Sequence, residues 1–312
     1  MINNQIRLFR VLTLTLLLTL FSSVGYAALD ACSLVTSSGV TPNVPPSTAA
    51  TLKMGVASNF YSPAIDVSQQ FILEPTHTSD TVLVCHNASG ALEEEITQGN
   101  TYNYSLFFSA NLYFAEEVSE SVYGGGSPFL YTRGIPVLFS TNLSVADMYN
   151  SSTNKIIIGP GHVQSFAYAN PLTAPYGEAT VNILQEFLDQ YDPIMNIATE
   201  YDNIGLTYDA ILSGTKDAGI VSKAQICPHL STANFVEFPS DYDVFQYGVL
   251  VKVGGTVPTI ASDYKDFVLT KTIQDRLVTN WCYRDTSGAK SCTGKATVHP
   301  AEKTTTKSTT KK

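Results

Sequence analysis

The sequence predicts an α/β protein with two lobes, each a mainly parallel sheet flanked by helices, and three observations lead to this prediction. Strand-like and helix-like patterns alternate along residues 52–111 and again along 155–251, as in sheets with crossover helices. The apolar segment 135–140 lies between the two series and can carry the chain from one lobe to the other. The chain has 312 residues, 44% apolar and 14% charged, which is enough for one large or two medium domains.

The first series consists of strands that each lead into a helix. The predicted elements are a strand at 52–57 and a helix to about residue 71, a strand at 81–85 and a helix at 91–98, and a strand at 104–108 that leads through Ser-Ala-Asn at 109–111 into a third helix. Three consecutive glycines at 124–126 then predict a flexible loop before the crossover segment.

The second series is centred on the motif Ala-Asn-Pro-Leu-Thr-Ala-Pro-Tyr-Gly-Glu-Ala at 169–179. We expect it to follow an apolar strand at 155–159 and to open a helix at 179–188, because two prolines and a glycine force a rigid turn. The later predicted elements are a helix at 204–212, a strand at 218–221, a strand at 247–251 that returns to the first lobe, and a closing helix at 261–280 with Phe267, Val268, Ile273, Leu277 and Val278 facing inward.

These elements divide the chain into five parts. They are a signal peptide at 1–28, a loose Ser-, Thr- and Pro-rich leader at 29–50, lobe 1 at 51–134 and 240–295, lobe 2 at 135–239, and a disordered Lys/Thr tail at 296–312.

The N-terminus has the pattern of a secretory signal. Arg7 and Arg10 precede an apolar run, and small residues follow it, so we expect cleavage near Ala27 or Ala28. Lipid anchoring at Cys32 is the less favoured alternative, because the sequence before it resembles a lipoprotein cleavage box only faintly. The formal charge is −9, and removal of the two arginines makes it −11 (−9 minus 2), which argues against a nucleic-acid partner.

Five cysteines, at positions 32, 85, 227, 282 and 292, are compatible with disulfides in an exported chain. Cys282 and Cys292 bracket a short polar loop, and we predict that they pair. The other three leave one odd thiol that the sequence does not assign. No two cysteines form a C-x-x-C pair, which disfavours a zinc or redox site.

Four predicted helix starts follow strands or extended segments and carry hydroxyl, amide or small residues. They are Ser58-Asn59, Ser89-Gly90, Pro175-Tyr176-Gly177 and Asp202-Asn203-Ile204. Taken singly, each is more simply a helix cap. Together, at the carboxyl ends of strands and without Lys or Arg, they predict a site where helix dipoles and neutral donors hold a small oxyanion.

An enzyme is not expected. His86 lies near Ser89 in the sequence, so a nucleophile–base pair is conceivable, but the chain has no Gly-x-Ser-x-Gly motif.

Several motifs resemble those of the periplasmic molybdate-binding proteins of ABC importers, a type 2 periplasmic-binding-protein family. They are Val-Ala-Ser-Asn-Phe at 56–60, Asn-Ala-Ser-Gly-Ala-Leu at 87–92, Leu-Phe-Phe-Ser-Ala-Asn at 106–111, the motif at 169–177, and Asp-Asn-Ile-Gly at 202–205. Their order and spacing agree over residues 52–280. The resemblance implies a periplasmic-binding-protein-like fold, with a hinge between the lobes and the ligand between them.

The resemblance also implies roles for particular residues. Ser58, Asn59 and Ser89, with the backbones of Tyr176 and Ile204, are expected to contact the oxyanion. Gly90 belongs to the expected site from the helix-start pattern alone, as a small residue that lets the backbone approach the ligand. Ser222 ends a strand where some members place a Tyr contact, and it is included among the expected ligand-binding residues. Asn111 stands where an Asp is usual.

We therefore expect a monomeric periplasmic protein without a cofactor that captures molybdate or tungstate and delivers it to an ABC permease in the inner membrane. Sulfate is somewhat less favoured. A diverged binding protein for another small ligand and an exported binding module that lost transport remain open.

Overall fold

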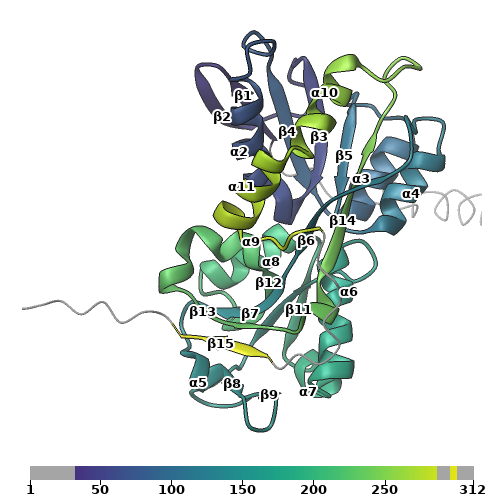
Figure 1. The fold of residues 1–312 in the computed structure, drawn as a ribbon. Helices are drawn as coiled ribbons and strands as arrows, with labels where there is room; N and C mark the ends of the chain where they lie inside the picture. Colours follow the sequence, from purple (N-terminus) through teal and green to yellow (C-terminus); the bar gives the residue numbers. More distant parts are fainter. Residues whose placement is uncertain (1–31, 287–295, 301–312) are drawn as a thin grey trace, which may run out of the picture.

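Two sheets, each flanked by helices, form the two lobes of the molecule (Figure 1). This computed structural model describes residues 32–286 and 296–300. The predicted signal peptide, Cys292 and most of the Lys/Thr tail lie outside the described residues.

Lobe 1 contains a seven-stranded sheet in the order β2-β1-β4-β3-β5-β14-β6. Its strands are β1 (Cys32–Thr36), β2 (Gly39–Val44), β3 (Leu52–Ala57), β4 (Val82–Asn87), β5 (Leu106–Ser109), β6 (Phe129–Gly134) and β14 (Val244–Leu250). Its helices are the short η1 (Ser58–Phe60), α2 (Tyr61–Phe71), α3 (Ser89–Thr97), α4 (Leu112–Glu120), α10 (Thr259–Val268) and α11 (Lys271–Trp281).

Lobe 2 contains a six-stranded sheet in the order β11-β10-β12-β7-β13-β15. Its strands are β7 (Pro136–Ser140), β10 (Phe166–Ala169), β11 (Ala198–Tyr201), β12 (Ala218–Ser222), β13 (Asn234–Glu237) and β15 (Thr297–His299), and β8 (Tyr149–Asn150) pairs separately with β9 (Lys155–Ile156). The helices are α5 (Val145–Met148), α6 (Pro175–Asn182) with its π-helical continuation η2 (Ile183–Phe187), α7 (Tyr191–Met195), α8 (Ile204–Leu212), α9 (Lys223–Ile226) and the 3₁₀ segments η3 (Cys227–Thr232) and η4 (Ser240–Tyr242).

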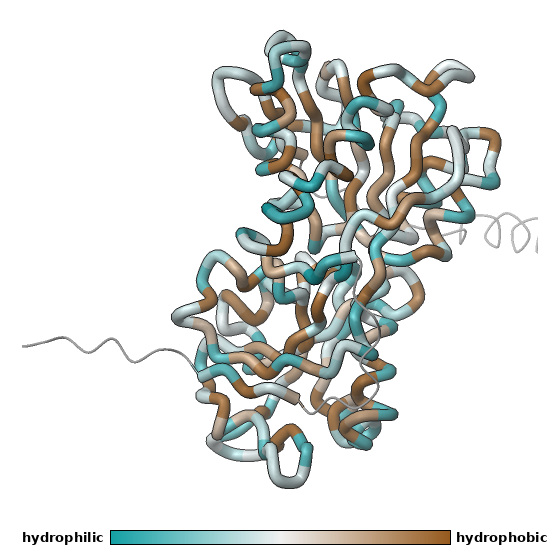
Figure 2. Tube along the Cα trace, in the orientation of Figure 1, coloured by the Kyte–Doolittle hydropathy of each residue, from teal (hydrophilic) through white to brown (hydrophobic). Residues whose placement is uncertain are grey.

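Burial of apolar strands and helix faces holds each lobe together. Brown and teal stretches alternate along the chain in both lobes (Figure 2). In lobe 1, Phe60, Phe108 and Tyr131 form a buried aromatic cluster with ring centroids 4.7–5.4 Å apart. Each such ring contributes about 1.5–3 kcal/mol through the area it removes from water. No described helix is long and apolar enough to cross a membrane.

The two-lobed α/β prediction is confirmed, but the sheets are mixed rather than mainly parallel. β3 pairs in parallel with β4 and β5, and β10 with β11 and β12. The other ladders are antiparallel, because the N-terminal strands, the crossover strands and β15 join the sheets through hairpins or returning segments rather than through crossover helices.

The chain passes between the lobes at Gly134–Ile135, beside the boundary predicted from the sequence, and returns between β13 and β14. A third connection follows α11. Arg284 forms an isolated bridge with Arg133, and β15 then adds to the edge of the lobe 2 sheet by pairing with β13. The tail prediction is therefore wrong over Thr297–His299.

Three further predictions are wrong in detail. The leader at 29–50 is not loose, since β1 and β2 form a hairpin on the lobe 1 sheet. The strand expected at 155–159 stops at Ile156, because Gly159 and Gly161 have positive φ and turn the chain back, and β10 precedes the central motif instead. The closing helix is two helices, α10 and α11, and Val278 is 39% exposed.

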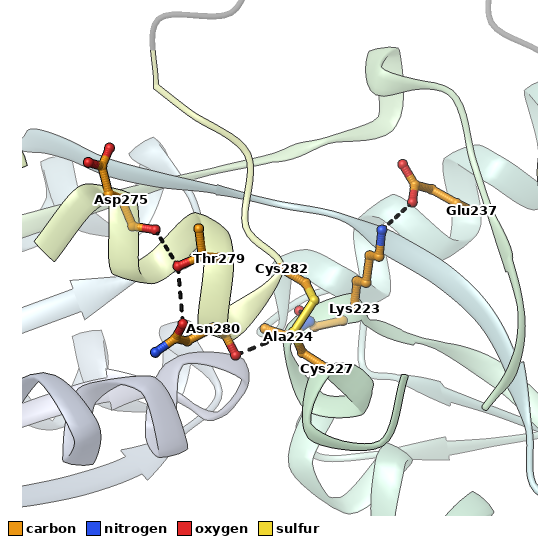
Figure 3. Close-up of a disulfide and its surroundings, with 9 residues drawn as sticks. Lys223, Ala224, Cys227, Glu237, Asp275, Thr279, Asn280 and Cys282 are labelled. Atoms are coloured by element: carbon orange, nitrogen blue, oxygen red, sulfur yellow. Dashed lines mark hydrogen bonds and ion pairs between the residues drawn. A yellow bond between two sulfur atoms is a disulfide. The ribbon is translucent and has the colours of Figure 1, made fainter. Parts of the chain in front are cut away.

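The cysteine prediction is also wrong. Cys282 pairs with Cys227, and Cys32 pairs with Cys85. Figure 3 shows that the first bond joins the end of α11 in lobe 1 to the segment after α9 in lobe 2. Cys32 is fully buried, and its sulfur is bonded to that of Cys85.

Candidate functional site

A small cavity lies between the lobes, where the starts of four helical segments meet. Its walls come from the ends of β3, β4 and β5 in lobe 1 and from the starts of α6 and α8 in lobe 2. The lining residues are Ala57, Ser58, Asn59, Asn87, Ala88, Ser89, Ala110, Ala174, Pro175, Tyr176 and Ile204. Five of the seven site residues predicted from the sequence therefore border one cavity.

The lining carries no lysine, arginine or carboxylate. Helix starts direct backbone N–H groups that lack intrahelical partners toward this space, with the positive end of each helix dipole. Small residues such as Ala57, Ala88 and Ala110 let the backbone border the cavity directly. These features suit a small anion held by neutral donors.

Ser89 is the first residue of α3 and is fully buried. Its Oγ accepts a hydrogen bond from the backbone N–H of Ala110 over 3.0 Å. Beside it, Asn87 Oδ1 accepts from the backbone N–H of Ala88 over 2.8 Å and from Asn203 Nδ2 of lobe 2 over 3.3 Å. This part of the wall is fixed by contacts on both sides of the lobe interface.

Ser58 follows β3 directly and is 8% exposed. Its Oγ lies 3.1 Å from Nδ1 of His86, a residue of β4 whose ring packs on that of Tyr61 with centroids 4.0 Å apart. The structure thus pairs His86 with Ser58, not with Ser89 as the sequence spacing suggested. The parallel register of β3 and β4 places Val56 opposite His86, and this brings the two side chains together.

Tyr176 lines the cavity at the first turn of α6, after Pro175 at the helix start. Its ring is 1% exposed, so it packs in the interior and is not a surface lid. The hydroxyl is 2.8 Å from Ser222 Oγ and accepts from Gln246 Nε2 over 3.3 Å. Burial raises the pKa of Tyr176 well above its ordinary value, so the phenol stays neutral.

Gly90 and Ser222 lie outside the cavity lining. Gly90 donates its N–H to the carbonyl of Thr173 over 2.9 Å, which joins lobe 1 to lobe 2. Ser222 caps α9, with Gln225 completing the capping box, and contacts the Tyr176 hydroxyl. Both residues contact residues next to the cavity and do not line it themselves. A direct ligand contact from either stays a prediction.

Asn59 contributes to the cavity and to a neutral network behind it. Its Nδ2 donates to Gln246 Oε1 over 3.0 Å and to the Tyr283 hydroxyl over 3.2 Å, and Gln246 Oε1 also accepts from Tyr131 over 2.8 Å. Sequence analysis missed Gln246, Tyr131 and Tyr283. The sequence offered one signal for this network. Gln246 is an uncharged polar residue at an inward position of the apolar strand β14.

An ion cluster lies next to this network, at the hinge where the chain passes between the lobes at Gly134–Ile135. Arg133 Nη2 donates to Asp243 over 2.7 Å, Arg284 contacts both Asp243 and Glu237, and Lys223 pairs with Glu237 over 2.6 Å. Burial alone would raise the pKa of Glu237, but Lys223 and Arg284 outweigh it, so this pKa is lowered. The cluster contains three cations and two carboxylates, and none of these five side chains lines the cavity.

A larger, more open hollow lies beside α6 and the hinge. Its lining includes Glu178, Glu186, Asp241 and Asp243, which makes it unsuited to an anion. Among residues 32–286 and 296–300, no three His, Cys, Asp or Glu side chains gather in a way that could hold a metal ion.

The chain is similar to known solute-binding proteins. Residues 52–280 match the family model of bacterial extracellular solute-binding proteins. The molybdate-binding protein ModA of Rhodobacter capsulatus is 27% identical over 228 residues, which cover 72% of this chain and 85% of that protein. The ModA of Azotobacter vinelandii is 26% identical over 181 residues, or 57% of this chain and 67% of that protein.

Solved structures show the same fold. The periplasmic molybdate-binding protein of Azotobacter vinelandii superposes with a TM-score of 0.64 at 25% identity, covering 75% of this chain and 98% of that one. The sulfate-binding protein SubI of Mycobacterium tuberculosis has a TM-score of 0.57 at 9% identity, covering 76% and 86%, and is similar in fold alone.

Proposed function

Since the chain belongs to the bacterial extracellular solute-binding proteins, we propose that it captures a tetrahedral oxyanion, molybdate or tungstate, and delivers it to the permease of an ABC importer. One observation carries this proposal. Helix starts from both lobes converge on one small cavity bordered by Ser58 and Ser89, and its lining holds no charged side chain.

The chemistry of the lining favours an anion of high charge and small size. A tetrahedral dianion offers four acceptor oxygens, and the serine hydroxyls and the N–H groups of Tyr176 and Ile204 can donate to them. Each hydrogen bond to a charged acceptor contributes about 1.5–3 kcal/mol. Several such bonds together, less the costs of desolvation and closure, correspond to a Kd of about micromolar to nanomolar. Similarity to proteins described as molybdate-binding supports the choice of molybdate as ligand.

Cellular location and partner follow from the same proposal. We infer a monomeric periplasmic protein, exported by the N-terminal signal, that presents its closed, loaded form to a permease in the inner membrane. A binding protein for another small ligand and an exported module without a transport role are the rival functions.

Calorimetry with molybdate, tungstate, sulfate and phosphate tests the ligand. We expect saturable 1:1 binding of molybdate and tungstate, and at least tenfold weaker binding in a variant with both Ser58→Ala and Ser89→Ala. Ser38→Ala, at an exposed position in the turn between β1 and β2, is the control and should bind as the parent does. Absence of heat and of any thermal shift with all four anions would exclude an oxyanion site.

A further inference from the structure

The two serines of the cavity differ in what holds their hydroxyl oxygens. An oxyanion offers only acceptors, so a serine helps to bind it only when its O–H proton points at the ligand. When the hydroxyl oxygen accepts a hydrogen bond from the protein, the hydroxyl proton remains available to donate to the ligand. At Ser89 the backbone N–H of Ala110 fulfils this condition at 3.0 Å, and a backbone N–H can act only as a donor.

At Ser58 the corresponding neighbour is a side chain. Nδ1 of His86 lies 3.1 Å from Ser58 Oγ, a hydrogen-bond distance. The imidazole is held in place by its strand, where His86 pairs with Val56 in the parallel register, and by the ring of Tyr61. The contact is therefore part of the framework of the site.

The two protonation patterns of the imidazole have opposite effects on Ser58. When Nδ1 carries a proton, it donates to Ser58 Oγ, and the serine proton is left for the anion. When Nδ1 carries a lone pair, Ser58 donates to it and turns its own lone pairs toward the cavity, where they repel an oxyanion. Only the first pattern makes Ser58 equivalent to Ser89.

Building on the proposed oxyanion function, we propose that His86 is a positioning residue that donates from Nδ1 to Ser58 Oγ and thereby holds the Ser58 hydroxyl as a donor to the bound anion. His86 does this for Ser58 as the Ala110 amide does for Ser89. It acts through Ser58 and does not itself border the cavity.

Asparagine and aspartate form a matched pair for the test. Asn places an N–H donor near the position of Nδ1, whereas ionised Asp has almost the same shape and only accepts. In calorimetry with molybdate we expect His86→Asn to bind within about threefold of the parent. His86→Asp and His86→Leu should each lose roughly 10-fold to 100-fold, the range for one hydrogen bond to a charged acceptor. Equal losses in the Asn and Asp variants would show a merely structural role and overturn the proposal.

A second comparison separates positioning from a direct effect of charge. In a Ser58→Ala background the His86→Leu substitution should no longer change molybdate affinity. An undiminished loss there would show that His86 acts on the anion without Ser58. If the parent protein binds none of the four anions, the proposed function fails. If the parent binds molybdate but these patterns do not appear, only the role of His86 fails.

Nitrogen NMR of histidine-labelled protein provides a readout that does not depend on the variants' affinities. The His86 resonances are assigned by their loss in His86→Asn. With molybdate bound, Nδ1 of His86 should give the signal of a protonated ring nitrogen. A lone-pair signal at Nδ1 in the bound state would contradict the proposal.

Discussion

The backbone N–H of Gly90 in lobe 1 donates to the carbonyl oxygen of Thr173 in lobe 2 over 2.9 Å, directly beside the cavity. The two lobes therefore touch directly beside the cavity. A Cβ on Gly90 would lie 2.9 Å from the Phe114 ring and 3.1 Å from the Thr173 Cα, so a larger residue would displace the Phe114 ring and crowd the Thr173 backbone.

We expect Gly90→Ala to hold the lobes apart and to weaken molybdate binding by roughly tenfold or more, because closure then carries a steric cost. Calorimetry measures the affinity, and small-angle scattering measures compaction on adding the ligand. Thr173→Ala keeps the backbone carbonyl and should bind as the parent does. Unchanged affinity and compaction in Gly90→Ala would show that this contact does not limit closure.

Tyr176→Phe should destabilise the protein by about 1–3 kcal/mol, because it leaves the buried Ser222 and Gln246 groups without the phenol. Molybdate affinity should change little, since the proposed contact uses the backbone amide. Urea denaturation and calorimetry check the two parts. Tyr168→Phe is the control: its hydroxyl donates to Glu200 at an exposed site, and its loss should change stability by at most about 0.5 kcal/mol. A large loss of affinity in Tyr176→Phe would mean that the hydroxyl, not the amide, serves the ligand.

The bond between Cys227 and Cys282 ties the lobes together and closes a loop with a sequence separation of 55. Changing both residues to Ser should lower the unfolding free energy by about 2–5 kcal/mol. The double variant should also expand more without ligand, as measured by small-angle scattering.

Non-reducing digestion and mass spectrometry of the parent protein should find Cys227–Cys282 and Cys32–Cys85 peptides. A Cys282–Cys292 peptide as the main product would contradict this pairing.

Acid should destabilise the hinge. Burial raises the pKa of Glu237, but the two cations Lys223 and Arg284 lower it by more than burial raises it. The pKa of Glu237 therefore lies below its ordinary value of 4.5. A carboxylate with a lowered pKa in the folded state stabilises the protein at pH values above its unfolded pKa, and this stabilisation is lost as the pH falls through the folded pKa. Unfolding free energy should therefore fall steeply below about pH 4.5.

Glu237→Gln should reduce stability at pH 7 by about 1.5–3 kcal/mol and flatten this acid dependence. Asp275→Asn, which breaks the exposed pair with Lys271, should change neither. Denaturation at a series of pH values measures both. A parent-like slope in Glu237→Gln would assign the acid dependence to other carboxylates.

Much of the fold was readable from the sequence because it depends on local patterns. The strand at 52–57 and the helix at 204–212 match β3 and α8 in their bounds, since apolar periodicity and capping residues lie next to each other in the chain. Ser58, Ser89 and Ile204 were found for the same reason, as residues at strand ends and helix starts. The turn at Gly159–Gly161 was missed because the run of three isoleucines before it, at 156–158, has the composition of a buried strand.

The sequence by itself determined the two-lobed α/β fold and the helix starts that border the cavity, because both follow from short-range patterns along the chain. Tertiary structure alone decided the partners of those residues. His86 lies opposite Ser58 because of strand register, Gln246 reaches Tyr176 through a return of the chain, and Cys227 meets Cys282 across the lobes. Such pairings depend on how distant segments meet in space, and no spacing within the sequence encodes that distance.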